Sequence, residues 1–307
     1  MTSADDHVAA RTVVFIAGAG RSGSTLLNAL LGQSPDVVAV GELRYLWERG
    51  ILAHRDCSCG ESVATCGTWA EVIARVGADG PTAEAMTEDL EAVVRVRSLF
   101  GRRSSKAEMA RRRVVARVQE VYTALEEVTG RRVFVDSSKR PMWGRVLAHL
   151  DDADLRVVHL VRDPRATAWS WQRHKSLHDG GPPVMQQLSP WRAAPLWILW
   201  NVTTEVLFGR TGAYRCVSYD RLAREPSVVV GEILEWAGAA PADCFGGANV
   251  ASLRPIHAIA GNADRLRLGR VEIRADDEWR RAMPGAQRAL VGLATAPFRR
   301  RYLAPHR

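Results

Sequence analysis

The chain has 307 residues, of which 47% are hydrophobic and 25% charged, an ordinary composition for a globular protein. No apolar run is as long as a membrane span, and the N-terminus is polar and acidic. We therefore expect a cytoplasmic protein with no signal peptide and no integral membrane segment. The net charge is +8, from 42 Lys and Arg against 34 Asp and Glu. Because the arginines are spread along helices and do not alternate with aromatic residues, this charge favours a phosphorylated small molecule or a solvated surface over nucleic acid.

The first pattern along the chain is a short apolar strand that runs into a glycine-rich loop. Residues 12–16 predict the strand, and the loop follows the spacing G-x-x-x-x-G-x-[ST] from Gly18 to Thr25. The usual phosphate-binding form of this pattern has a lysine before its last residue, where this chain has Ser24. A helix over about 24–31 is expected to follow the loop.

The loop keeps most of the chemistry of a phosphate site without that lysine. Gly18, Gly20 and Gly23 permit the tight wrap that points backbone N–H groups inward, and the following helix adds its positive N-terminal end. The cationic side chain is Arg21, which lies inside the loop. We expect such a loop to bind a phosphate, but without the point charge that grips the β- and γ-phosphates of a nucleoside triphosphate. A strand-to-helix turn with no ligand is the alternative interpretation.

Apolar runs rich in β-branched residues recur along the chain, with helical patterns between them. This alternation predicts a central parallel sheet with helices on both faces, a three-layer α/β fold of the P-loop type. We expect one domain over 1–307, with a flexible tail over 1–11, a helical insertion over about 69–130, and a lid and aromatic helix over about 175–205. The expected strands cover 12–16, 37–40, 131–136, 155–163 and 214–220.

The segment from residue 169 to residue 200 is unusually aromatic. It holds five of the ten tryptophans, on both sides of the sequence HDGGPP (178–183). Aromatic residues at helical spacing are more often core than binding surface. A glycine- and proline-rich loop beside them nevertheless favours a mobile lid over an apolar pocket.

A second motif, RVVHLVRDPRATAWSWQRHK, lies at the end of the fourth expected strand. Asp163 is a good helix N-cap and Pro164 suits the first helical position, so a helix is expected to begin directly after the strand. Arg162 then lies at the carboxyl edge of the sheet, where open α/β folds bind ligands, and Ser170 lies two turns along the helix. An arginine and a hydroxyl at one place make a second phosphate site. The alternative is an Arg162 paired with a helix C-terminus and an exposed Ser170.

Together, GAGRSGSTLL and LVRDPRATAWS resemble the paired signature of sulfotransferases that use 3′-phosphoadenosine 5′-phosphosulfate (PAPS). The resemblance implies that the first motif binds the 5′-phosphosulfate and that Arg162 and Ser170, eight positions apart, bind the 3′-phosphate. The family's cytosolic branch has lysine in the first loop. Arg21 instead resembles the arginine that the carbohydrate and tyrosyl-protein branches and many bacterial members have in this loop. The resemblance extends from residue 12 to about 300 and includes VDSSK (135–139), VSYDRLAREP (217–226) and HAIAGNADRLRLG (257–269).

The resemblance also implies roles for individual residues. Glu42, directly after the second expected strand, is similar to the glutamate base of some branches, and Lys139 is a candidate for stabilising the bridging oxygen. The alternatives are a loop glutamate paired with Arg44 and a solvated lysine. The nucleotide is expected to contact Gly20, Arg21, Ser22, Gly23, Ser24, Thr25, Arg162 and Ser170, and, at its 3′-phosphoadenosine end, Tyr219, Asn262 and Arg265.

The expected reaction moves the sulfuryl group of PAPS to a hydroxyl or amine and releases adenosine 3′,5′-bisphosphate (PAP), with no metal ion. The tryptophan-rich segment suits a small-molecule, lipid or carbohydrate acceptor, and the sequence indicates no oligomeric state. A P-loop kinase or NTPase is the main alternative, for which Asp136 or Asp163 could bind Mg²⁺, but Ser24 cannot replace the lysine. A non-enzymatic nucleic-acid binder leaves two phosphate sites on one sheet edge unexplained.

Five cysteines in a cytoplasmic chain of this size do not indicate a disulfide scaffold. Cys57, Cys59 and Cys66 lie close together, with His54 just before them, and such a group could bind zinc. Their spacing fits no standard ligand pattern, so a packed or redox-sensitive loop is favoured. Metal binding and a disulfide are both left open.

Overall fold

The computed structural model of the chain describes residues 10–95, 104–174, 176, 179–180 and 185–303. A sheet of five strands forms its centre, and every neighbouring pair in it is parallel. The strand order is β2-β3-β1-β4-β5. The prediction of a parallel sheet from five apolar segments is therefore confirmed. The strands are β1 (Arg11–Ala17), β2 (Val37–Gly41), β3 (Val133–Lys139), β4 (Ala153–Val161) and β5 (Tyr214–Ser218).

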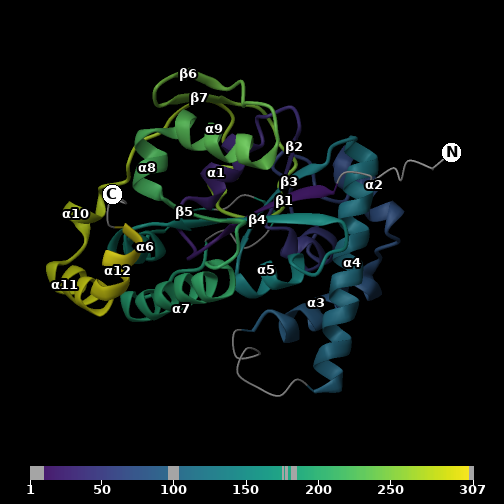
Figure 1. Cartoon of the computed structure of the whole chain (residues 1–307), viewed down its shortest axis with the longest axis horizontal. Coiled ribbons are helices and arrows are strands. Elements are labelled where there is room, and N and C mark those ends of the chain that lie inside the picture. Colours follow the sequence, from purple (N-terminus) through teal and green to yellow (C-terminus); the bar gives the residue numbers. More distant parts are fainter. Residues whose placement is uncertain (1–9, 96–103, 175, 177–178, 181–184, 304–307) are drawn as a thin grey trace.

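Helices cover both faces of this sheet, which gives the expected three-layer α/β fold (Figure 1). One face carries α1 (Ser24–Leu31), α8 (Tyr219–Arg224) and α9 (Pro226–Ala237), and the other carries α5 (Pro141–Leu147) and α7 (Pro190–Phe208). The next helices extend from α7 and β5: the first packs on α7, the next two pack on the first, and the last packs along β5. They are α6 (Pro164–Gln172), α10 (Trp279–Ala282), α11 (Gly285–Ala294) and α12 (Ala296–Leu303).

Strand β1 explains why both faces need cover. Its successive side chains point to opposite sides of the sheet, as the pleat of a strand requires. Val13 and Phe15 are buried in the core on the α5 and α7 face, whereas Val14 and Ile16 are buried in the core on the α1 and α9 face. A strand that is apolar on both sides is stable only between two layers.

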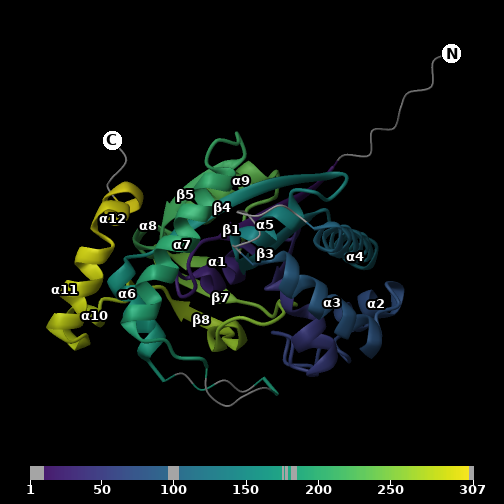
Figure 2. The ribbon, with the colours of Figure 1, turned by 90° about the horizontal axis from the view of Figure 1, so that it is seen from below.

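Three helices lie between β2 and β3 in the chain and at one end of the molecule in space, opposite α10–α12 (Figure 2). They are α2 (Gly67–Arg75), α3 (Gly80–Val93) and α4 (Ser105–Thr129). The apolar stripe of α4 is buried at Val114, Val118, Val121 and Leu125, as its helical spacing predicts. All three helices, α2, α3 and α4, pack on the hydrophobic core that lies on the α5 and α7 face of the sheet.

A second, antiparallel sheet follows α9 and was not expected from the sequence. It consists of β6 (Phe245–Gly247), β7 (Val250–Leu253) and β8 (Gly269–Glu272). The segment between β7 and β8 returns to the main sheet, where the Ile259 N–H donates to the Val40 carbonyl at 2.9 Å and the Glu42 N–H donates to the Ile259 carbonyl at 2.7 Å. It therefore passes the carboxyl end of β2.

Short helical turns complete the described elements: η1 (Leu43–Tyr45), η2 (Leu46–Leu52) and η4 (Ala263–Leu266). Within the described ranges, no helix combines the length and apolar character needed to cross a bilayer. Most of the expected tail over 1–11 and of the loop over 178–183 lies outside the described residues.

Candidate active site

The glycine-rich loop wraps between β1 and α1 at the carboxyl edge of the sheet. Gly23 has a φ of 94°, and a Cβ atom at this position would lie 2.4 Å from the ring of Tyr219, so only glycine fits. Helix α1 begins at the next residue, with no acidic side chain in its first turn to neutralise its positive end. Arg21 has a φ of 70°, in the left-handed region that non-glycine residues rarely adopt. Loop and helix end form an anion-binding concavity.

Arg162 connects this loop to the second motif. It follows β4, and α6 begins two residues later with Asp163 as its N-cap, as the sequence predicts. Its side chain is 7% exposed and lies over the ring of Tyr219, with 4.5 Å between guanidinium carbon and ring centroid. One nitrogen donates to the Arg21 carbonyl at 3.2 Å, and another pairs with Asp276 at 3.0 Å. The guanidinium is therefore held in a fixed orientation beside the loop.

Glu42 and Lys139 form an ion pair because β2 and β3 are neighbours in the sheet and both end at this edge. The Lys139 Nζ lies 2.5 Å from a Glu42 carboxylate oxygen, and both side chains are largely buried. Burial raises the pKa of the Glu42 carboxyl, but the charge of Lys139 and its hydrogen bond outweigh this effect and leave the pKa below its ordinary value. Glu42 is thus ionised at neutral pH and able to accept a proton.

The segment after Ile259 closes the loop from the side of β2. The Asn262 main-chain N–H donates to the Thr25 hydroxyl at 3.4 Å, and the side-chain oxygen Oδ1 of Asn262 accepts from the Arg21 guanidinium at 3.5 Å. The Arg21 guanidinium also lies over the ring of Trp171, 4.7 Å from its centroid. These contacts hold the Arg21 guanidinium in place beside the N-terminus of α1.

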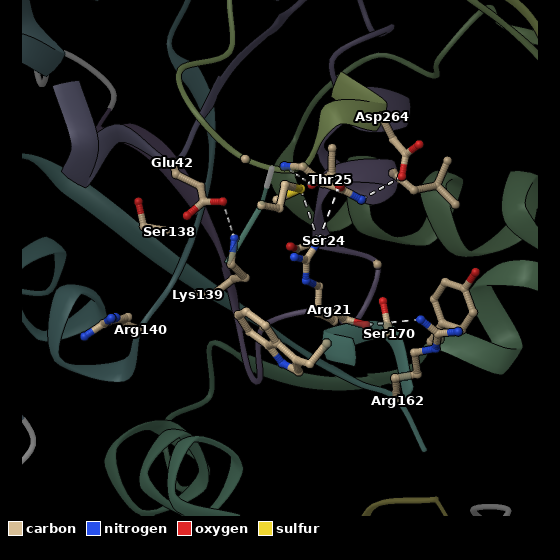
Figure 3. A pocket seen from close by; sticks show the side chains of 18 of the residues that line it. Arg21, Ser24, Thr25, Glu42, Ser138, Lys139, Arg140, Arg162, Ser170 and Asp264 are labelled. Carbon is tan, nitrogen blue, oxygen red and sulfur yellow. Dashed lines mark hydrogen bonds and ion pairs between the residues drawn. The ribbon is translucent and has the colours of Figure 1, made fainter. Parts of the chain in front are cut away.

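These groups line one cavity of about 910 Å³. Ten arginines and Lys139 line it, against four carboxylates, so the site carries an excess of positive charge suited to a multiply anionic ligand. Figure 3 shows the Glu42–Lys139 pair on one side of Arg21, and Ser170 and Arg162 on the other. The cavity therefore offers two separated anion sites with a proton acceptor next to one of them.

The structure brings most of the sequence-predicted residues together here. Ser22 does not line the cavity, because its hydroxyl donates back to the Ala19 carbonyl at 2.7 Å. Arg265 does not line it either, since its guanidinium pairs with Asp179 at 2.8 Å with both side chains 2% exposed. The predicted residues that line the cavity are Gly20, Arg21, Gly23, Ser24, Thr25, Glu42, Lys139, Arg162, Ser170, Tyr219 and Asn262.

Sequence reasoning missed several lining residues. Asp276 pairs with both Arg162 and Arg173, at 3.0 and 2.6 Å, but follows β8 in a segment without a motif. Arg44 and Arg49 lie over the ring of Tyr45, with 3.8 and 3.6 Å between guanidinium carbons and ring centroid. Their short distance from Glu42 in the sequence could have indicated this position, because residues that closely follow the same strand end tend to line the same cavity.

The two carboxylates considered for Mg²⁺ are both engaged elsewhere. Asp136 is fully buried and accepts from Trp143 at 2.7 Å and from the Ser138 N–H at 2.8 Å. Asp163 caps α6 and pairs with Arg165 at 2.6 Å. Neither side chain lines the cavity formed by the described residues.

Comparison with known proteins identifies the family of the chain. The model of the sulfotransferase family matches residues 13–243, more than half of the chain. The chain belongs to the sulfotransferase family and is a transferase that moves a sulfuryl group. This membership decides against the kinase alternative. No curated protein sequence matches the chain significantly.

Two solved structures are similar over nearly the whole chain. The sulfotransferase domain from the Synechococcus PCC 7002 olefin synthase is 21% identical, with 96% of this chain and 98% of that chain covered and a TM-score of 0.47. The sulfotransferase domain from the curacin biosynthetic pathway is 18% identical, with 93% and 98% covered and a TM-score of 0.52. The second likeness supports the fold.

Proposed function

We propose that the donor is PAPS and that the acceptor is a hydroxyl or amine of a small molecule, a lipid or a carbohydrate. The observation that carries the proposal is the order of groups in the cavity. Arg162 and Ser170 lie on one side of Arg21, and Glu42 with Lys139 lies on the other (Figure 3). A nucleotide with a phosphate at its 3′ position and a phosphosulfate at its 5′ position spans that order.

The residues present fit this donor. Arg162, held by Asp276, presents a guanidinium fork to the 3′-phosphate next to Ser170, which is 4% exposed. Arg21 and the N-terminus of α1 bind the 5′-phosphate, in a loop where Gly23 leaves room for close backbone approach. The excess of cationic side chains around the cavity suits the charge of the nucleotide.

Glu42 and Lys139 then divide the chemistry of transfer. The acceptor oxygen or nitrogen forms a bond to sulfur while the bond between sulfur and the phosphate oxygen breaks, and PAP leaves with that electron pair. The acceptor's proton passes to the Glu42 carboxylate, and Lys139 stabilises the charge that develops on the bridging oxygen. As Lys139 turns toward the leaving group, the pKa of Glu42 rises and the carboxylate becomes a better base.

The acceptor side of the cavity combines apolar and cationic surface. Trp200 and Leu199 line it, and the Arg140 guanidinium lies over the Trp200 ring at 5.6 Å. Burial and then the like charge of Arg44 lower the pKa of Arg140, so an anion beside the two arginines relieves their repulsion. This composition favours an amphiphilic acceptor that carries a carboxylate, phosphate or sulfate. A cytoplasmic location stays a prediction from the sequence.

Isothermal titration with PAP, ATP and 5′-AMP tests the choice of donor. PAP should bind at least about tenfold more tightly than either competitor, because only PAP places a phosphate on Arg162 and Ser170. Equal affinity for PAP and ATP would contradict the proposal.

A further inference from the structure

A cluster of sulfur and nitrogen atoms lies between two segments that are distant in the sequence. The ligand atoms of Cys57, Cys59, Cys66 and His257 all lie within 4.8 Å of one another. Cys66 Sγ lies 3.2 Å from His257 Nδ1 and 3.6 Å from Cys59 Sγ, and Cys57 Sγ lies 3.9 Å from the same nitrogen. Four ligands placed tetrahedrally at about 2.0–2.3 Å from one ion lie about 3.5–3.8 Å apart, so these separations match ligands of a shared ion.

We propose that these four side chains hold a structural zinc ion. Three thiolates and one imidazole are a preferred ligand set of closed tetrahedral zinc sites, whereas a typical iron–sulfur cluster takes four thiolates. Because all four positions are filled by the protein, no position stays open for water or substrate. The ion supports the structure and takes no part in sulfuryl transfer, and the proposal is independent of the identity of the donor.

The backbone on both sides of the cluster is held in place. Residues 57–60 form a turn in which the Gly60 N–H donates to the Cys57 carbonyl at 3.0 Å. The Ser58 hydroxyl donates to the carbonyl of residue 256 at 2.8 Å and accepts from the N–H of residue 258 at 2.9 Å. Trp69 donates to the His257 carbonyl at 2.7 Å. These bonds fix the main chain of residues 256–258 against the cysteine turn, as a preformed metal site requires.

The charge beside the cluster also suits a metal complex. Zinc bound by three thiolates and a neutral imidazole carries one net negative charge. Arg265 is buried, and a negative charge on Cys57 would favour its cationic form. Within the described residues its Nε and Nη1 have no hydrogen-bond partner. Its remaining nitrogen is shared between Asp179 and the Asp56 carbonyl. The cation that the sequence suggested for the nucleotide therefore lies next to the proposed zinc site.

The ion connects the cysteine turn to the segment that reaches the active site. Two residues after His257, Ile259 lies beside Gly41 at the end of β2. Its N–H donates to the Val40 carbonyl, and its carbonyl accepts from the Glu42 N–H. Three residues further, the Asn262 N–H donates to the Thr25 hydroxyl. Zinc at this cluster thus fixes the segment that passes the proposed base and ends at the phosphate loop.

Metal analysis of the full chain, purified under reducing conditions without chelator, tests the proposal. We expect about one zinc ion per chain by mass spectrometry, and Co²⁺ exchanged into the protein should give d–d bands of a tetrahedral site with a sulfur-to-cobalt charge-transfer band. Cys59→Ser and His257→Ala should lower the zinc content at least about fivefold and lower the melting temperature. Cys244→Ser and His54→Ala, which change a cysteine and a histidine outside the cluster, should keep about one zinc ion.

The wild-type measurements decide the matter even if a ligand variant does not fold. Wild-type protein with five titratable thiols that contains no zinc and takes up no Co²⁺ would overturn the proposal. A disulfide between Cys59 and Cys66, found by peptide mapping in freshly purified protein, would overturn it in favour of a redox-sensitive loop. Zinc retained in His257→Ala with an unchanged cobalt spectrum would remove His257 from the ligand set.

Discussion

Replacement of Arg162 by alanine tests how the cavity distinguishes one nucleotide from another. Arg162 is 6% exposed, and its guanidinium pairs with Asp276 at 3.0 Å and lies over the Tyr219 ring. In the proposed complex it donates to the 3′-phosphate of the donor. A hydrogen bond to a charged group is worth about 1.5–3 kcal/mol, so Arg162→Ala should weaken PAP binding about 10- to 150-fold.

The assay is isothermal titration of wild type and variant with PAP and with 5′-AMP, which lacks the 3′-phosphate. Affinity for 5′-AMP should change less than about threefold, because that ligand never uses the arginine. Arg165→Ala is the matched control. It removes an arginine three residues away that pairs with Asp163 at 2.6 Å and lies outside the cavity, so PAP affinity should be unchanged.

Equal losses for PAP and 5′-AMP would refute this reasoning. Arg162 also donates to the Arg21 carbonyl at 3.2 Å, so equal losses would mean that it acts by shaping the loop and not by reading the 3′-phosphate. An unchanged affinity for PAP would place the 3′-phosphate elsewhere in the cavity.

Three further predictions concern the base, the loop and the pH dependence. Glu42→Gln should lower turnover about 100-fold or more with PAP affinity nearly unchanged, while the exposed Glu48→Gln should change neither turnover nor PAP affinity; normal turnover in Glu42→Gln would mean that another residue is the base. Gly23→Ala should lower the free energy of unfolding more than Gly238→Ala, because both positions have positive φ but only the first places a Cβ against a tyrosine ring; urea titration compares them. Burial lowers the pKa of His159 to about 4, so the unfolded chain binds a proton below about pH 6.5 that the folded chain does not. The free energy of unfolding of the wild type should therefore fall by about 3 kcal/mol more than that of His159→Gln between pH 6.5 and 4. Urea titrations across this pH range measure both, and an equal pH dependence of the two proteins would contradict this.

Much of the fold could be predicted because its main strands can be recognised from short stretches of the sequence. Each parallel strand lies between two helical layers and is apolar on both sides, which leaves a run such as residues 12–16 visible in the sequence. Helix α1 also has the expected bounds, since glycines mark both of its ends. Strands β6–β8 were missed because they are short and partly exposed, and they lack that run.

The site was less predictable where it depends on strand order. Glu42 pairs with Lys139 and not with Arg44, because β2 and β3 are neighbours in the sheet. In the sequence, 91 residues lie between the end of β2 at Gly41 and the start of β3 at Val133, and this interval holds α2, α3 and α4. Arg265 lies on a motif that suggests the nucleotide, yet its guanidinium turns to Asp179. The cysteine cluster fits no local ligand spacing because its fourth member, His257, lies 191 residues after Cys66.

The most direct test of the central claim is transfer from sulfur-labelled PAPS. The wild-type chain is incubated with [³⁵S]PAPS and a metabolite extract in buffer without Mg²⁺, beside a parallel reaction with [γ-³²P]ATP and Mg²⁺. We predict that ³⁵S appears in an organic product together with an equal amount of PAP, that Glu42→Gln forms far less of it, and that no ³²P is transferred. Phosphoryl transfer from ATP that requires Mg²⁺, with no label moved from PAPS, would contradict the account.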